Sequence, residues 1–156
     1  MIELNIPGRG DISIMNVVFD VNGTIAIDGL VTNEIKEKLA QLEKKVSVCL
    51  LTADTYGTIE SEMGKSGIRI HRITSPEEAK KKDDFITKIG EQQTIAVGNG
   101  ANDTLMLKRA VVGICVIDRE GASAEAVRNA DIVVYGQESV FDLLNHPERI
   151  IATLRE

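Results

Sequence analysis

Short apolar runs and amphipathic segments follow one another along the chain. The apolar runs have the length of buried strands, and the segments between them carry hydrophobic residues three or four positions apart, as helices packed on one face do. Strands that alternate with helices at this spacing predict an α/β fold, a doubly wound, three-layer, Rossmann-like parallel sheet with helices on both faces. The strands expected in this sheet are Val17–Asp20, Val46–Leu51, Ile68–Ile73, Thr94–Val97, Val111–Ile117 and Ile132–Val134.

The N-terminal segment predicts a hairpin that leads into the first of these strands. Apolar and polar residues alternate over Ile2–Ile6 and again over Ile12–Ile14, around a turn at Pro7–Gly10. We expect a hairpin over residues 1–14 within a single domain that covers residues 1–156.

Caps, glycines and prolines mark the expected helix ends. Thr32 is a typical N-cap, and a helix from about Thr58 to Lys65 should end at Gly67. Pro76 is well placed to start the next helix. Further helices are expected through Leu105–Leu107, over residues 122–130 and, as one last helix, from Val140 to Leu154, and a short flap at Ile25–Gly29 carries an Asp-Gly turn.

Composition narrows the class of protein. The chain has a formal net charge of −6 and only five aromatic residues, two Tyr and three Phe, so it offers neither a basic stripe nor a stacking platform for nucleic acid. No apolar run is long enough to span a membrane, and Glu3 and Asn5 interrupt the N-terminus before a signal peptide could form. We expect a cytoplasmic protein without a nucleic-acid or membrane partner.

Polar clusters follow several of the predicted strands. Asp20 and Thr52 end two of them, a lysine-rich segment at residues 80–82 starts the helix before a third, and the loop Asn99–Asp103 follows that third strand. Because parallel strands end at one edge of the sheet, where open α/β folds bind their ligands, we expect these clusters to form one site.

The same clusters resemble the motifs of the haloacid dehalogenase-like phosphohydrolase superfamily. Asp20-Val21-Asn22-Gly23-Thr24 resembles its nucleophile loop, and the later motifs look most like the phosphorylation domain of P-type ATPases. Leu51-Thr52-Ala53-Asp54 resembles the Thr-Gly-Asp segment of those pumps, and Gly98–Asp103 resembles their Gly-Asp-Gly-x-Asn-Asp segment.

The resemblance implies an aspartyl-phosphate mechanism with Mg²⁺ as cofactor and a small phosphorylated substrate. It assigns catalysis to Asp20 as nucleophile, to Asn22 and to Lys82, and phosphate binding to Thr52, Ala53, Gly23 and Asn102. The implied metal ligands are Asp20, the backbone carbonyl of Asn22, Asn99, and Asp103 directly or through water. Lys82 is chosen over Lys80 and Lys81 because the family lysine precedes apolar residues at +3, +4 and +7, here Phe85, Ile86 and Ile89. Lys80 and Lys81 fit better into a solvated charge run with Glu77, Glu78, Asp83 and Asp84.

Two departures from the family pattern leave the activity open. Position 22 holds Asn where the phosphatases have an acid, and an amide cannot transfer a proton; Asn99 replaces an acidic metal ligand. One interpretation is a slow Mg²⁺-dependent phosphatase, and the alternative is a phosphate-binding or phosphoaspartyl regulatory module without significant turnover. A receiver-type switch domain fits less well, because receivers carry the phosphorylated Asp on a middle strand and an acidic pair on the first.

Only 31 residues lie between Asp20 and Thr52. This leaves no room for the large nucleotide-binding insertion of the pumps or for a sizeable cap domain. Because capless relatives often associate, the resemblance also raises a homo-oligomer as an expectation.

Overall fold

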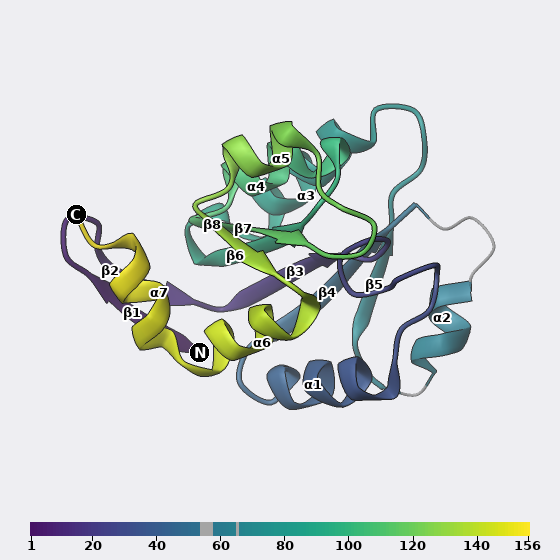
Figure 1. Ribbon diagram of the computed structural model, residues 1–156, viewed down its shortest axis with the longest axis horizontal. Coiled ribbons are helices and arrows are strands. Elements are labelled where there is room, and N and C mark those ends of the chain that lie inside the picture. Colours follow the sequence, from purple (N-terminus) through teal and green to yellow (C-terminus); the bar gives the residue numbers. More distant parts are fainter. Residues whose placement is uncertain (54–57, 65) are drawn as a thin grey trace.

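A six-stranded, all-parallel sheet forms the centre of the computed structural model, which describes residues 1–53, 58–64 and 66–156 (Figure 1). The strand order is β5-β4-β3-β6-β7-β8. The chain winds outward from β3 to β5 and then returns to β6 on the other side of β3, which confirms the doubly wound fold. The strands are β3 Asn16–Asp20, β4 Ser47–Thr52, β5 Arg69–Arg72, β6 Thr94–Gly98, β7 Val112–Ile117 and β8 Ile132–Tyr135.

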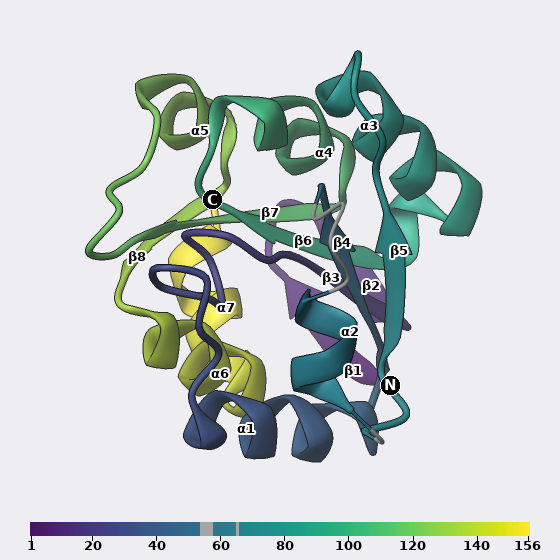
Figure 2. The ribbon, with the colours of Figure 1, turned by 90° about the vertical axis from the view of Figure 1, so that its right-hand side faces the viewer.

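Helices cover both faces of the sheet, as Figure 2 shows. Helices α3, α4 and α5 lie on one face, and α1, α2, α6 and α7 lie on the other. The helices are α1 Asn33–Glu43, α2 Thr58–Met63, α3 Glu78–Ile89, α4 Thr104–Arg109, α5 Ala124–Asn129, α6 Gln137–Asn145 and α7 Pro147–Leu154, with short 3₁₀ helices η1 Glu91–Gln93 and η2 Ala101–Asp103.

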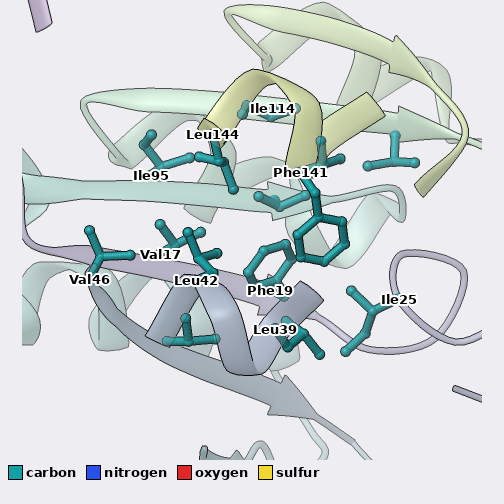
Figure 3. Close-up of a cluster of buried hydrophobic side chains, with 14 of the residues drawn as sticks. Val17, Phe19, Ile25, Leu39, Leu42, Val46, Ile95, Ile114, Phe141 and Leu144 are labelled. Carbon is teal, nitrogen blue, oxygen red and sulfur yellow. The ribbon is translucent and has the colours of Figure 1, made fainter. Parts of the chain in front are cut away.

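Strand β3 lies in the middle of the core because its side chains alternate between the two faces. Val17 and Phe19 point into the larger hydrophobic cluster, and Val18 points into the smaller one under α3, α4 and α5. In the larger cluster the ring of Phe19 stacks on Phe141 of α6 with centroids 5.7 Å apart (Figure 3). This packing fixes the place of β3 in the core, and Asp20 lies at the end of that strand.

The N-terminal hairpin forms as expected from β1 Ile2–Ile6 and β2 Gly10–Ile14, which pair in antiparallel register as a separate two-stranded sheet. Its apolar residues join the larger cluster together with Ile150 and Leu154 of α7. The hairpin therefore extends the core at the end of the molecule away from the site.

Two helix predictions need correction. The last helix is broken into α6 and α7, because Pro147 lacks an N–H and disfavours helical geometry at His146, which has φ −126° and ψ 73°. Helix α3 begins at Glu78, two residues after Pro76. The predicted end of the second helix at Lys65 lies outside the described residues. Across the described parts of the chain, no helix is both long and apolar enough to cross a membrane.

Candidate active site

Asp20 and Asn99 lie on either side of the point where the strand order reverses. Asp20 ends β3, Asn99 directly follows β6, and these two strands are hydrogen-bonded neighbours. Thr52 ends β4 on the other side of β3 and is buried. The structure thus brings these three predicted residues to the same edge of the sheet, at the place where doubly wound folds bind ligands.

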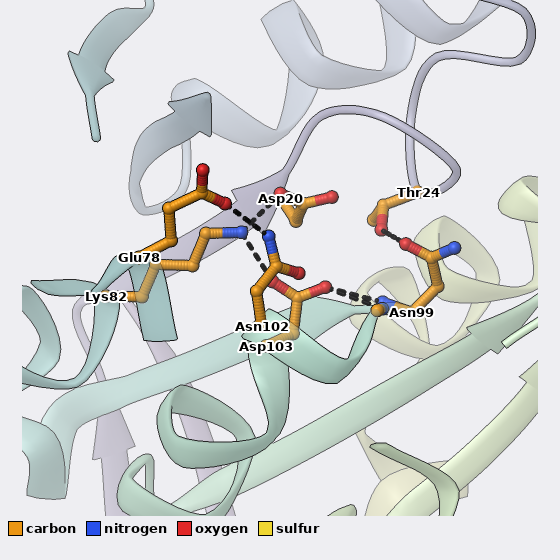
Figure 4. A network of polar contacts seen from close by, with 8 residues as sticks. Asp20, Thr24, Glu78, Lys82, Asn99, Asn102 and Asp103 are labelled. Carbon is orange, nitrogen blue, oxygen red and sulfur yellow. Dashed lines mark hydrogen bonds and ion pairs between the residues drawn. The ribbon is translucent and has the colours of Figure 1, made fainter. Parts of the chain in front are cut away.

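Lys82 bridges two carboxylates at this edge (Figure 4). Its Nζ donates to Asp20 Oδ1 at 2.6 Å and to Asp103 Oδ1 at 2.6 Å, and its side chain is 1% exposed. Lys80 is exposed, and the Lys81 amine donates to the backbone and hydroxyl oxygens of Thr74. The register argument therefore selected the lysine that reaches Asp20.

Asp103 holds the loop after β6 in place. Its Oδ2 accepts the backbone N–H groups of Asn99 at 2.9 Å and Gly100 at 2.8 Å, while its Oδ1 accepts from Lys82. A Cβ on Gly98 would lie 2.6 Å from Asp103 Cγ, so only glycine lets the carboxylate approach this closely. Asp103 is fully buried and committed to these three donors, an arrangement that positions Lys82.

Asn99 ties three loops together. Its Oδ1 accepts from the Thr24 hydroxyl at 3.2 Å, its Nδ2 donates to the Gly121 carbonyl at 3.1 Å, and its own carbonyl accepts from the Ser123 N–H at 2.8 Å. Gly23, at φ +76°, leaves the space for this side chain, because a Cβ there would lie 2.3 Å from Asn99 Nδ2. The amide thus makes a donated hydrogen bond that the carboxylate of the family pattern could not make.

The charges in this cluster are unbalanced. Burial raises the pKa of Asp20 from its ordinary 3.8 to about 7, and Asp103 raises it too, against the opposing effect of Lys82. Burial alone would lower the pKa of Lys82, but the two carboxylates outweigh it and the pKa is raised. One ammonium serves two buried carboxylates, so the site lacks positive charge.

The other predicted site residues differ in their exposure and in their hydrogen bonds. Gly23 is buried in the loop after β3, whereas the Asn22 side chain is exposed and Ala53 is half-buried. Asn102 Nδ2 donates to Glu78 Oε2 at 2.9 Å, so this amide does not stand free for a phosphate. Asp54, part of the Thr52 motif, lies outside the described residues.

Sequence reasoning missed two members of the network. Glu78 was assigned to a solvated charge run, but it is half-buried and bonded to Asn102. Its position four residues before Lys82 on α3 is a usable signal, since such residues share a helix face. Thr24 received no role, although it is buried and contacts Asn99.

The donors at the edge suit a hard cation such as Mg²⁺. The Asp20 carboxylate and the Asn99 amide supply oxygen atoms, which Mg²⁺ prefers, and this ion commonly takes only one or two carboxylates from the protein. Asp20 shares the neighbouring ammonium of Lys82 with Asp103, so a second cation at this edge would balance the two carboxylates. Among the described residues no group of three or more His, Cys, Asp and Glu side chains could hold a metal by itself. The residues fit a weak divalent site rather than a dedicated metal cage.

Solved structures with the same architecture decide the fold. The chain superimposes on a probable YrbI family phosphatase from Pseudomonas syringae pv. phaseolica with a TM-score of 0.68 and 17% identity, over 91% of this chain and 87% of that one. It matches a HAD superfamily (subfamily III A) hydrolase from Legionella pneumophila with a TM-score of 0.66 and 15% identity, over 90% and 87% of the two chains. The chain has the haloacid dehalogenase-like fold.

A third haloacid dehalogenase-like neighbour was solved with ligands. The 3-deoxy-D-manno-octulosonate 8-phosphate phosphatase from Moraxella catarrhalis, in complex with magnesium, phosphate and the sugar, matches with a TM-score of 0.64 and 17% identity, over 91% and 94% of the two chains. At this identity the likeness concerns the fold.

Sequence comparison finds relatives in Methanocaldococcus jannaschii. The uncharacterized protein MJ0073 is 40% identical over 88 residues, 56% of this chain and 88% of that protein, so the two belong to one family. A soluble P-type ATPase-like phosphatase is 28% identical over 127 residues, 80% of this chain; the chain spans about half, 46%, of that relative. No protein-family model matches. The name of this relative agrees with the resemblance of the motifs to P-type ATPases.

Proposed function

We propose that this protein is a slow, Mg²⁺-dependent phosphatase that forms an aspartyl phosphate on Asp20 with small phosphorylated substrates. The fold neighbours and the P-type ATPase-like relative support a phosphatase-type hydrolase. The observation that carries the proposal is the placement of Lys82 Nζ 2.6 Å from both Asp20 and Asp103, at the sheet edge where Thr52 also ends its strand.

The cluster supplies positive charge where the proposed reaction needs it. A phosphomonoester dianion repels the carboxylate that attacks it, so positive charge must lie between them. Lys82 provides one such charge and lies against the nucleophile, while Asp103 holds the ammonium in place. The Thr52 hydroxyl, at the end of β4, would donate to the phosphoryl oxygens. The predicted phosphate contact of Gly23 is not supported, because its backbone N–H donates to the Ala26 carbonyl at 2.8 Å.

Asp20, the backbone carbonyl of Asn22 and the Asn99 amide oxygen would hold Mg²⁺. Asp103 would position these groups indirectly, because it accepts hydrogen bonds from Lys82 and from the loop after β6. When bound, the ion supplies the second positive charge that neutralises the phosphoryl oxygens. The single carboxylate among these donors predicts weaker binding than in relatives with an acid at position 99.

Asn22 supplies no general acid or base. It cannot protonate the leaving oxygen or take a proton from the hydrolytic water, and such help is typically worth about 10² to 10⁴ in rate. Weakly basic leaving groups that depart without a proton, such as p-nitrophenolate and the carboxylate of an acyl phosphate, depend least on such help and should react best.

The test is phosphate release from p-nitrophenyl phosphate and acetyl phosphate with Mg²⁺, combined with acid-quench trapping of phosphoenzyme. We expect slow release and a trapped acid-stable adduct in the wild type, and neither in Asp20→Asn. Release that persists in Asp20→Asn would contradict the aspartyl-phosphate mechanism.

A second function, a phosphate-binding or phosphoaspartyl regulatory module, is favoured by the two amides at positions 22 and 99. In that case acetyl phosphate labels Asp20 without multiple turnovers, or phosphate binds without labelling. Counting phosphate released per protein molecule separates this outcome from catalysis.

A further inference from the structure

A third carboxylate belongs to the polar network of the site. Within the described residues, the contacts around Lys82 and Asn102 join Asp20, Asp103 and Glu78 (Figure 4). Asp20 is the proposed nucleophile, and Asp103 is fully committed to Lys82 and two backbone N–H groups. Glu78 uses only Oε2, on Asn102, and its Oε1 has no hydrogen-bond partner in the described parts of the chain.

Glu78 lies nearer to solvent than Lys82 on the same helix, since Glu78 is half-buried and Lys82 is fully buried. It lies four residues before Lys82, so the two side chains share a face of the helix and are about 6 Å apart along its axis. Helix α3 starts just beyond the carboxyl end of β5, at the same sheet edge as Asp20, so one turn toward its N-terminus leads outward from Lys82. Figure 4 shows the Glu78 carboxylate bonded to Asn102 and the Lys82 amine bonded to Asp20 and Asp103.

A substrate reaches the site from solvent, and Glu78 is the more exposed of the two α3 side chains in the network. The phosphoryl group has to reach the buried Asp20–Lys82 pair, so the leaving group points outward, toward the level of Glu78. The half-buried carboxylate can exchange protons with solvent, and Asn102 fixes its orientation. Contact with solvent and a fixed orientation are two of the properties that a proton donor to the leaving group needs.

We infer that Glu78 is the general acid and base of the site and takes the part that Asn22 cannot perform. This inference rests on the proposed phosphatase function. In the first step an Asp20 oxygen bonds to phosphorus, the bond from phosphorus to the leaving oxygen breaks, and Glu78 gives its proton to that oxygen. In the second step Glu78 takes a proton from water, whose oxygen bonds to phosphorus while the aspartyl-phosphate bond breaks. Phosphate leaves, and Glu78 is again protonated.

Glu78→Gln tests the inference with little structural change. The glutamine carbonyl can accept the Asn102 hydrogen bond but cannot transfer a proton. The control is Glu77→Gln, which makes the same charge change at the exposed neighbouring residue. Both variants are compared with the wild type and with Asp20→Asn on a size-matched pair of substrates, p-nitrophenyl phosphate and phenyl phosphate.

Proton donation predicts a loss that depends on the leaving group. Phenolate is the more basic leaving group, so kcat/KM of Glu78→Gln should fall about 10²-fold or more on phenyl phosphate and far less on p-nitrophenyl phosphate. Acid-quenched phosphoenzyme from p-nitrophenyl phosphate should increase, because the second step loses its base. Glu77→Gln should match the wild type in both respects.

Equal losses on both substrates with no increase in phosphoenzyme would assign Glu78 a purely structural part and overturn the inference, while the phosphatase function stands. Wild-type activity on p-nitrophenyl phosphate alone, with no turnover of phenyl phosphate, also overturns it. Absence of any Asp20-dependent release by the wild type overturns the proposed function itself, and the inference with it.

Discussion

The Thr24 hydroxyl donates to the side-chain oxygen of Asn99 at 3.2 Å, across 75 positions of sequence. The same amide donates through Nδ2 to the Gly121 carbonyl. Asn99 therefore links the loop after β3, the loop after β6 and the loop before α5 by protein hydrogen bonds alone. The donated hydrogen bond to Gly121 requires the amide, because an aspartate at this position could not donate it.

Asn99→Asp should remove the hydrogen bond to Gly121 and add a carboxylate to the site. The carboxylate can no longer donate to Gly121, so the metal-free protein should lose about 1–3 kcal/mol of unfolding free energy. A second carboxylate at the site should strengthen Mg²⁺ binding. Urea denaturation in EDTA measures the first effect and calorimetric titration with Mg²⁺ the second. Unchanged Mg²⁺ affinity would show that position 99 does not face the ion.

Lys82→Met should destabilise the protein strongly. It preserves much of the side-chain volume but leaves the carboxylates of Asp20 and Asp103 buried without a cation, at a cost of about 3–5 kcal/mol. Urea denaturation provides the measurement. The control is Arg128→Met, which removes an exposed pair with Glu125 and should cost less than about 1 kcal/mol.

A second variant separates charge from packing at Lys82. Adding Asp20→Asn to Lys82→Met removes one of the two unpaired charges and should recover part of the lost stability. If the double variant is as unstable as the sum of the single ones, the loss comes from packing rather than from buried charge.

Stability of the metal-free protein should depend on the protonation of Asp20. Its pKa is raised to about 7 in the folded protein, mainly by burial, against 3.8 ordinarily, so the folded state binds this proton more tightly. The contribution is therefore complete below about pH 4 and is lost as the pH rises to about 7. Melting temperatures in EDTA between pH 5 and 8 should fall more for the wild type than for Asp20→Asn. Parallel curves would contradict the raised pKa.

Added Mg²⁺ should show the opposite trend. The ion competes with the proton for the Asp20 carboxylate, so it should raise the melting temperature more at pH 8 than at pH 5. Asp20→Asn serves as the control, because its amide does not titrate. An Mg²⁺ effect of equal size at both pH values would place the ion away from Asp20.

The fold could be predicted from the sequence because its signals are local. Apolar runs such as Val111–Ile117 have no competing helical pattern, and parallel connections leave few topologies. The break between α6 and α7 was missed because the apolar residues on both sides of Pro147 continue one helical stripe. The apolar stripe indicates which residues are buried, but the proline determines where the helical backbone is interrupted.

The site was predictable only as far as strand ends and motif spacing reach. These placed Asp20, Thr52, Asn99 and Asp103 at one edge and selected Lys82 by register. They could not reveal that Glu78 bonds to Asn102, because this contact depends on how α3 and η2 pack side by side. Strand ends and motif spacing also could not show that both carboxylate oxygens of Asp103 accept hydrogen bonds from neighbouring donors, because these partners depend on the folded loop.

Asn22→Asp should restore the acid of the family pattern and reveal whether Glu78 already fills its place. On phenyl phosphate, an added acid can raise the rate by about 10² to 10⁴ only where proton transfer limits it. If Glu78 transfers the proton in the wild type, Asn22→Asp should help little there and much more in the Glu78→Gln background. The four proteins form a double-mutant cycle in kcat/KM, and the expected result is strong non-additivity. Equal gains in both backgrounds would show that the two positions act independently, and Glu78 would then not be the group that replaces the missing acid.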